Sequence, residues 1–228
     1  MKPLLIVIDG PAGAGKTTVS KTLSERLDYK YIDTGALYRG VAYEILARGL
    51  DPADEDGLAR LLADLDLRFE RGADGMRLYS AGVDITDYIR TPEVTMLASA
   101  ASAKPIVRQA LLDLQRGLGK QKAAVFEGRD MGTVVFPDAD VKFFLTADLK
   151  VRARRRYEEL RGKSSQSLEE VENDMQQRDA NDSGRDTAPL KPASDAVTVD
   201  STDKPVDSVI DEMLARIREI TGQDMMAP

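Results

Sequence analysis

The apolar run Leu4-Leu5-Ile6-Val7-Ile8 leads, one residue later, into Gly10-Pro11-Ala12-Gly13-Ala14-Gly15-Lys16-Thr17. The second stretch matches the phosphate-binding loop pattern Gly-x-x-x-x-Gly-Lys-Thr at every fixed position. The apolar run favours a buried strand, and Val19, Leu23 and Leu27 recur at helical spacing after the loop. A chance glycine-rich turn is the alternative, but it does not account for these flanks. The stretch predicts a nucleoside triphosphate site in an α/β fold and leaves the phosphate acceptor open.

The residue types of this loop suit a triphosphate. Glycines let the backbone bend tightly, so that successive N–H groups point at phosphate oxygens, and the following helix adds the positive end of its dipole. Lys16 can bridge the β- and γ-phosphates of ATP, and the Thr17 hydroxyl can ligate Mg²⁺. We expect the ATP-binding residues of the loop to be Gly10, Pro11, Ala12, Gly13, Ala14, Gly15, Lys16, Thr17 and Thr18.

The residue composition limits which groups can take part in catalysis. The chain has 228 residues, enough for one large domain or two small ones, with 42% apolar and 31% charged residues. It contains no cysteine, which excludes disulfides and thiolate chemistry, and no histidine, which removes the commonest general base. Catalysis must then use Lys, Arg, Asp, Glu, hydroxyls, backbone amides and metal ions, a set that suits phosphoryl transfer.

Charge and hydropathy restrict the partners. The net charge of −7 argues against general nucleic-acid binding, because no basic field attracts a polyanion. The apolar run at residues 4–8 is too short for a signal peptide, and no run approaches the length of a membrane span. We expect a soluble, cytoplasmic protein that binds neither nucleic acid nor a membrane.

Strands and helices alternate along most of the chain, which predicts a parallel sheet covered on both faces. Between about residues 66 and 92, short alternating runs surround glycine-containing turns, including one at 72–75, and predict an inserted antiparallel meander. A capping box at Ser167 starts a helix expected to end near Asp179, before a polar, mobile segment at residues 181–186. We expect a frayed tail at residues 223–228.

Arginines recur near predicted strand ends and loops: Arg39, Arg90, Arg108, Arg129, Arg178 and Arg185. In open parallel sheets, ligands gather beyond the carboxyl ends of the strands. For any one of these arginines, a surface ion pair is the simpler interpretation. Several of them converging near the loop would instead neutralise the phosphates of two nucleotides.

A very basic helix is expected from about residue 152 to 161, with Arg152, Arg155 and Arg156 on one face. Two interpretations stay open: a solvated basic face, or a lid helix that closes over the triphosphate. Two carboxylates follow a predicted strand nearby. Glu127 could act on Mg²⁺ through a bound water or simply cap the strand, and Asp130 could accept a hydrogen bond from an exocyclic amine.

Seven segments together resemble the bacterial cytidylate kinase family, in its order and over nearly the whole chain. They are residues 8–16, 33–39, 89–94, 107–111, 128–139, 177–179 and 182–190, and the run Gly128-Arg129-Asp130-Met131-Gly132-Thr133 is far more specific than the phosphate loop. The resemblance implies a single P-loop kinase domain over 1–228. It also implies a monophosphate-binding insert at about 66–92 and a lid at about 152–187.

The resemblance assigns the acceptor side residue by residue. Cytosine is expected to contact Ser99, Arg108 and Asp130, and the CMP phosphate Arg39, Arg129 and Arg185, with Thr34 nearby. Asp182 and Arg178 resemble the family's sugar-contacting pair, and Arg178 can also face the transferred phosphoryl group. The implied catalytic residues are Lys16, Arg129, Arg178 and Arg185, with Arg155 and Arg156 of the lid helix on ATP. Many relatives have Ser where this sequence has Thr34, and Asp where it has Glu127. The hydroxyl and the carboxylate are therefore retained at these two positions.

These observations predict a P-loop α/β kinase, a monomer by resemblance, that transfers the ATP γ-phosphoryl group to CMP or dCMP in pyrimidine nucleotide metabolism with Mg²⁺. No general base is needed, because the attacking phosphate oxygen is already ionised at neutral pH. A UMP, shikimate or gluconate kinase is the nearest alternative. A regulatory NTPase is the alternative from another class, but the chain lacks an Asn-Lys-x-Asp base-reading motif.

Overall fold

The computed structural model describes residues 2–72, 75–162 and 164–223, apart from the side chain of Arg71. The middle of the expected 72–75 turn and nearly all of the expected tail at 223–228 lie outside the described residues. The chain forms two compact units. Unit 1 comprises Met1–Tyr31 and Gln121–Pro228, and unit 2 comprises Ile32–Lys120.

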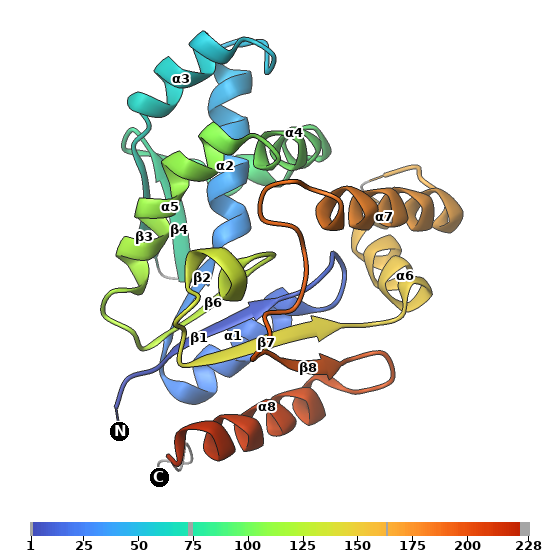
Figure 1. Cartoon of the computed structure of the whole chain (residues 1–228). Helices are drawn as coiled ribbons and strands as arrows, with labels where there is room; N and C mark the ends of the chain where they lie inside the picture. The colour runs from blue at the N-terminus through green and yellow to red at the C-terminus, as the bar shows by residue number, and fades with distance from the viewer. Residues whose placement is uncertain (1, 73–74, 163, 224–228) are drawn as a thin grey trace. The chain divides into compact units, whose positions relative to one another are not determined.

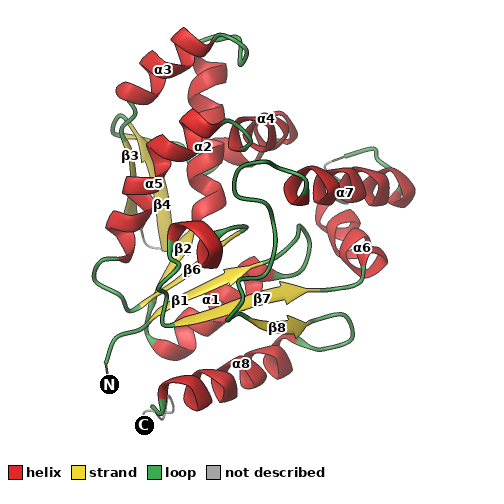
Figure 2. Ribbon diagram, in the orientation of Figure 1, coloured by secondary structure: helices red, strands yellow, loops and turns green. Residues whose placement is uncertain are grey.

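A parallel sheet with the strand order β2-β6-β1-β7-β8 forms the centre of unit 1, and its edge strand β2 includes the last residues of the first segment of unit 1 and the first residues of unit 2. The strands are β1 (Leu5–Asp9), β2 (Lys30–Asp33), β6 (Ala124–Gly128), β7 (Val141–Thr146) and β8 (Val197–Asp200). Strand β1 lies in the middle, with Ile6 opposite Val125 of β6 and Val141 of β7. All five residues of β1 are buried, as expected for a central strand covered on both faces. The expected parallel sheet is therefore confirmed (Figure 2).

The helices of unit 1 lie against this sheet or beyond its end (Figure 1). They are α1 (Lys16–Leu27), α6 (Leu149–Leu160), α7 (Leu168–Ser183) and α8 (Val206–Thr221). One face of the sheet packs on α1 and α8 around Ile6, Phe143 and Met213, which are at most 1% exposed. Burying each such side chain contributes roughly 1.5–3 kcal/mol. Helices α6 and α7 lie side by side beyond the carboxyl end of β7 and pack through Ala153 and Val171 (Figure 1).

The strand β6 is followed by an unusual turn, η2 (Met131–Val135), which has the wide π-helical pitch. The N–H of Val135 donates to the carbonyl of Asp130, and the N–H of Phe136 donates to that of Met131, both five residues back. Single π-helical turns of this kind often occur at functional sites. This one directly follows the Gly-Arg-Asp segment of the sequence, and the carbonyl of Asp130 accepts from the N–H groups of Val134 and Val135 within it.

Unit 2 combines helices with the small antiparallel sheet that the sequence predicts. The helices are α2 (Thr34–Ala47), α3 (Glu55–Ala63), η1 (Tyr88–Arg90), α4 (Pro92–Ser102) and α5 (Pro105–Gly119), and the strands are β3 (Leu67–Gly72), β4 (Gly75–Ser80) and β5 (Val83–Asp84). The strands pair antiparallel in the order β3-β4-β5. Leu37, Val41 and Leu78 belong to its buried core. Gly40 of α2 allows a close approach, since a Cβ there would lie 3.0 Å from Leu67.

Helix α7 differs from its prediction. It continues to Ser183 instead of ending near Asp179, and Asp182 in its last turn is only 2% exposed. The segment expected to be polar and mobile is therefore helical at its start and carries a buried carboxylate. Among the described helices, none combines the length and the apolar content that crossing a bilayer requires.

Candidate active site

The phosphate loop folds as its glycines require. Gly10 has φ +150°, and a Cβ at that position would lie 2.0 Å from the carbonyl oxygen of Leu145 on β7. Gly15, with φ +89°, starts α1, and no side chain among the described residues caps that helix. Only glycine combines the close approach with the left-handed conformation. The loop thus presents the N-terminal N–H groups of α1, the arrangement that binds phosphates.

Lys16 lies folded against its own loop. Its ammonium group donates to the carbonyl oxygens of Gly10 (2.8 Å) and Pro11 (2.7 Å). Burial lowers the pKa of Lys16 well below its ordinary value, and the positive charges of Arg129 and Arg178 lower it further. Lys16 thus lies close enough to Arg129 and Arg178, two other predicted catalytic cations, to be repelled by both, and a bound polyphosphate would relieve this repulsion.

Thr17 and Glu127 lie in direct contact. The Thr17 hydroxyl donates to Oε1 and Oε2 of Glu127 at 2.9 and 3.2 Å. A second hydroxyl, that of Tyr31 on β2, donates to Glu127 Oε1 at 2.5 Å. Glu127 is 5% exposed at the end of β6, so its negative charge is fixed beside the start of α1. The structure therefore places Thr17, the predicted Mg²⁺ ligand, in contact with Glu127, for which the sequence left open an action on Mg²⁺ through a bound water or a capping role. It adds Tyr31, which the sequence pattern did not single out.

Asp9 is a further residue that sequence reasoning missed. It ends β1 directly before Gly10, and its carboxylate accepts hydrogen bonds from the N–H groups of Met131 (2.9 Å) and Gly132 (2.8 Å). Burial raises the pKa of Asp9 from 3.8 to about 6, against the effect of these hydrogen bonds. Its position, a carboxylate closing an apolar strand next to the loop, was the available signal. Asp9 ties the phosphate loop to the turn η2.

Arg129, Asp182 and Arg185 form a cluster around one buried carboxylate. Arg129 Nε donates to Asp182 Oδ2 at 3.0 Å, and Arg185 Nη2 donates to Asp182 Oδ1. Asp182 is 2% exposed, so both guanidinium groups are held by a desolvated charge. Asp130, next to Arg129, is buried to the same degree. The structure thus joins two arginines predicted for the CMP phosphate with the aspartate predicted for its sugar.

The basic helix α6 divides its arginines among different partners. Arg152 is buried and donates to the carbonyl oxygens of Ala147 and Ala12, and it pairs with Asp179 at 2.7 Å. The idea of one solvated basic face is therefore wrong for Arg152, because these carbonyls and a carboxylate surround it. Its contact with Ala12 links α6 to the phosphate loop.

The two arginines predicted to contact ATP also differ. Arg155 donates to the hydroxyl and the carbonyl of Ser201, at 3.1 and 2.7 Å. A Cβ on Gly15 would lie 3.9 Å from Arg155 Nη1, so this guanidinium borders the phosphate loop. Arg156 is 41% exposed and pairs with Glu159, one turn along the same helix. Arg155 thus borders the phosphate loop, whereas Arg156 forms a partly exposed ion pair within its own helix.

Unit 2 carries the remaining predicted residues in two groups. In the first, Asp33 caps α2 by accepting from the N–H of Ala36, and Arg39 pairs with Asp33 at 2.6 Å. Thr34, at the start of the same helix, is 1% exposed. The Arg39 Nε is buried without a hydrogen-bond partner among the described residues. An acceptor such as a phosphate oxygen would satisfy it.

The second group joins α4 and α5. Arg108 is 8% exposed, donates to the carbonyl of Ser102 at 3.1 Å and lies 5.6 Å from the ring centre of Tyr38. The Ser102 hydroxyl in turn donates to the carbonyl of Ser99. Ser99 and Arg108, both predicted for cytosine, are therefore linked through Ser102.

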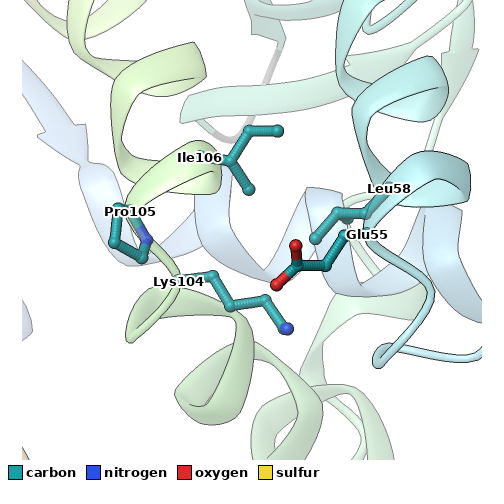
Figure 3. A pocket seen from close by; sticks show the side chains of 5 residues that line it. All are labelled: Glu55, Leu58, Lys104, Pro105 and Ile106. Carbon is teal, nitrogen blue, oxygen red and sulfur yellow. The ribbon is translucent and has the colours of Figure 1, made fainter.

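A pocket of about 240 Å³ also lies in unit 2 (Figure 3). It is lined by Glu55, Leu58, Lys104, Pro105 and Ile106. The Glu55 carboxylate and the Lys104 ammonium lie on the same side of it in Figure 3. None of the predicted nucleotide-binding residues lines this pocket.

Comparison with known proteins agrees with these motifs. A family model described as cytidylate kinase matches residues 6–219. A cytidylate kinase from Geobacter sulfurreducens is 48% identical over 217 residues, which cover 95% of this chain and 93% of the relative. Another from Syntrophotalea carbinolica is 47% identical over 219 residues, covering 96% and 93%.

Solved structures show how widely the fold is shared. A gluconokinase from Sinorhizobium meliloti is 15% identical, with a TM-score of 0.51, and the match covers 96% of this chain and 94% of the gluconokinase. At that identity the likeness establishes the fold alone. The match at 48% identity and the family model over 6–219 are more specific. The chain belongs to the cytidylate kinase family.

Proposed function

We propose that this nucleotide kinase transfers the γ-phosphoryl group of ATP to CMP, and also to dCMP, giving ADP and CDP or dCDP. The proposal rests on one observation above all: Asp182 holds Arg129 and Arg185 in the same unit as the phosphate loop. Two guanidinium groups match an acceptor that is itself a doubly charged phosphate, whereas shikimate and gluconate each carry a single carboxylate. The family model supports cytidylate as that acceptor.

We propose that the donor and acceptor contacts divide as follows. The loop at residues 10–18 binds the phosphates of ATP, with Arg155 and Arg156 approaching when the lid, about 152–187, closes. Arg39, Arg129 and Arg185 bind the CMP phosphate beside Thr34, and Arg178 and Asp182 contact the sugar. Residues 66–92 serve as the monophosphate-binding insert, and the protein acts as a monomer.

Base recognition in this proposal depends on Asp130, Arg108 and Ser99. Cytosine offers an exocyclic amine beside the N3 and O2 acceptors, so a carboxylate, a guanidinium and a hydroxyl together can satisfy its edge. Uracil presents a carbonyl oxygen where the Asp130 carboxylate needs a donor. The resulting buried mismatch disfavours UMP.

The residues beside Thr17 fit Mg²⁺. The Thr17 hydroxyl and the Glu127 carboxylate are hard oxygen donors in contact, at 2.9 Å. Within residues 2–72, 75–162 and 164–223, no cluster of three or more acidic, His or Cys side chains could hold a metal by itself. Mg²⁺ typically keeps several waters and binds one or two protein groups together with substrate phosphates. When bound, it supplies positive charge against the β- and γ-phosphates.

The chain's own residues then have defined tasks. An oxygen of the CMP phosphate attacks the γ-phosphorus, and the bond from that phosphorus to the bridging oxygen of ADP breaks. Lys16 exchanges its carbonyl partners Gly10 and Pro11 for phosphate oxygens. Arg129, Arg178 and Arg185 neutralise charge on the reacting phosphates and align them. Closure of the lid excludes water, which would otherwise accept the phosphoryl group.

A coupled ADP-release assay with CMP, dCMP, UMP, AMP, shikimate and gluconate tests this function. We expect strong stimulation by CMP and dCMP, and weak or no stimulation by the other acceptors. Preferred turnover of UMP, shikimate or gluconate would replace the proposal with the corresponding kinase. Slow ATP hydrolysis that no acceptor stimulates would favour a regulatory NTPase.

A further inference from the structure

Glu127 is held by two hydroxyl groups from different elements of unit 1. Thr17, in the first turn of α1, donates to both of its oxygens. Tyr31, on β2, donates to Oε1. Strands β2 and β6 are neighbours in the sheet, so the phenol reaches the carboxylate directly. The carboxylate therefore has a fixed orientation, which a glutamate with three rotatable bonds does not have by itself.

The direction of these hydrogen bonds matters for a cation. Because the Thr17 hydroxyl donates its proton to Glu127, the lone pairs of its oxygen remain available to a metal ion. That orientation lasts only while the carboxylate stays in place. Glu127 is 5% exposed, so water has little access to replace a lost partner.

Tyr31 is itself held in position. The Lys21 ammonium on α1 lies 5.6 Å from the centre of its ring, within the range of a cation–π contact. The ring thus lies between a cation on α1 and a carboxylate on β6. A phenylalanine would keep the ring and this contact and would lose only the hydroxyl.

We propose that Tyr31 is a positioning residue for the Mg²⁺ of the nucleotide site: its hydroxyl orients Glu127, and Glu127 orients Thr17. Tyr31 does not contact the nucleotide. Groups that hold metal-binding residues typically change metal affinity by about 10–100-fold when removed. This inference rests on the Mg²⁺-dependent transfer proposed above, and it makes a separate prediction about binding.

Isothermal titration calorimetry of Tyr31→Phe measures that prediction without any acceptor. ATP is titrated in the presence of Mg²⁺ and, separately, in excess EDTA. We expect the affinity for ATP with Mg²⁺ to fall about tenfold, and the affinity for metal-free ATP to stay within about twofold of wild type. The Mg²⁺ concentration for half-maximal activity should rise similarly.

Tyr29→Phe is the matched control. Tyr29 belongs to the same unit, and its hydroxyl accepts from the N–H of Leu4 at 3.1 Å. We expect this variant to keep the wild-type ratio of affinities with and without Mg²⁺. A double-mutant cycle with Glu127→Gln tests the route of the effect: once the carboxylate is gone, Tyr31→Phe should change the ratio by less than about twofold.

Three results would overturn the role of Tyr31. They are an unchanged ratio in Tyr31→Phe, an equal loss of affinity with and without Mg²⁺, and a full tenfold effect that persists beside Glu127→Gln. The proposed function fails differently. A protein in which Tyr31→Phe lowers the Mg²⁺-dependent affinity, but which phosphorylates no CMP, would refute the function and support the positioning role.

Discussion

Replacing Asp9 by asparagine tests the link between the phosphate loop and the turn η2. The carboxylate accepts the N–H groups of Met131 and Gly132, and an asparagine can accept only one of them well. Losing one of these two hydrogen bonds lowers the free energy of unfolding by about 1–2 kcal/mol, and this effect is the same at every pH. The replacement also removes a titrating group, so a second, pH-dependent effect accompanies it.

The size of the pH-dependent effect follows from the raised pKa of Asp9. Burial moves it from 3.8 to about 6. A carboxyl whose pKa is higher in the folded state stabilises the fold at low pH, and this contribution is lost as pH rises through the folded pKa. This change in the pKa of Asp9 corresponds to about 3 kcal/mol of stability in total. Roughly half of that stability is lost between about pH 5 and pH 8.

Urea unfolding at several pH values measures this effect. We expect the free energy of unfolding of wild type minus that of Asp9→Asn to fall by about 1.5 kcal/mol between about pH 5 and pH 8. Asp207→Asn is the control, since the Asp207 side chain is 81% exposed and its ion pair with Arg26, at 3.3 Å, is of the exposed kind that contributes less than about 1 kcal/mol. A difference that is flat, or that rises with pH, would show that Asp9 is not a buried carboxylate held as described.

Two further variants test the cationic groups. Lys16→Ala should lower kcat on the order of 10³-fold while thermal melting stays cooperative, because the ammonium serves the phosphates more than the fold; near-normal turnover would contradict its assignment. Asp182→Asn should raise the KM for CMP about tenfold, because it weakens the hold on Arg129 and Arg185, whereas the exposed neighbour change Asp186→Asn should not. Equal KM values for CMP in these two variants would show that Asp182 does not contribute to binding the acceptor.

Much of the fold was predictable because its signals are local. Five buried residues followed by Gly10 and Lys16 specify a strand, a loop and a helix within a short window. The meander was also predictable, since alternation between turns is a property of neighbouring residues. The cytidylate kinase motifs add residue identities that local patterns cannot provide.

The buried polar contacts were not predictable, because each depends on where distant segments meet. Asp182 lies 53 positions from Arg129, and Tyr31 lies 96 positions from Glu127. In the sequence, Asp182 belongs to a polar run that suggests exposure. The structure buries it because Arg129 and Arg185 compensate its charge.

Recognition of cytidylate is tested by the ratio of kcat/KM for CMP to that for UMP, measured in wild type and in Asp130→Ala. If Asp130 recognises cytosine, the ratio should be at least about 100 in wild type, since a site built to bind an amine rejects a carbonyl strongly. In Asp130→Ala this ratio should fall at least about tenfold, mainly because the kcat/KM for CMP decreases. A wild-type ratio near one, or a ratio that Asp130→Ala leaves unchanged, would contradict cytidylate recognition by this residue.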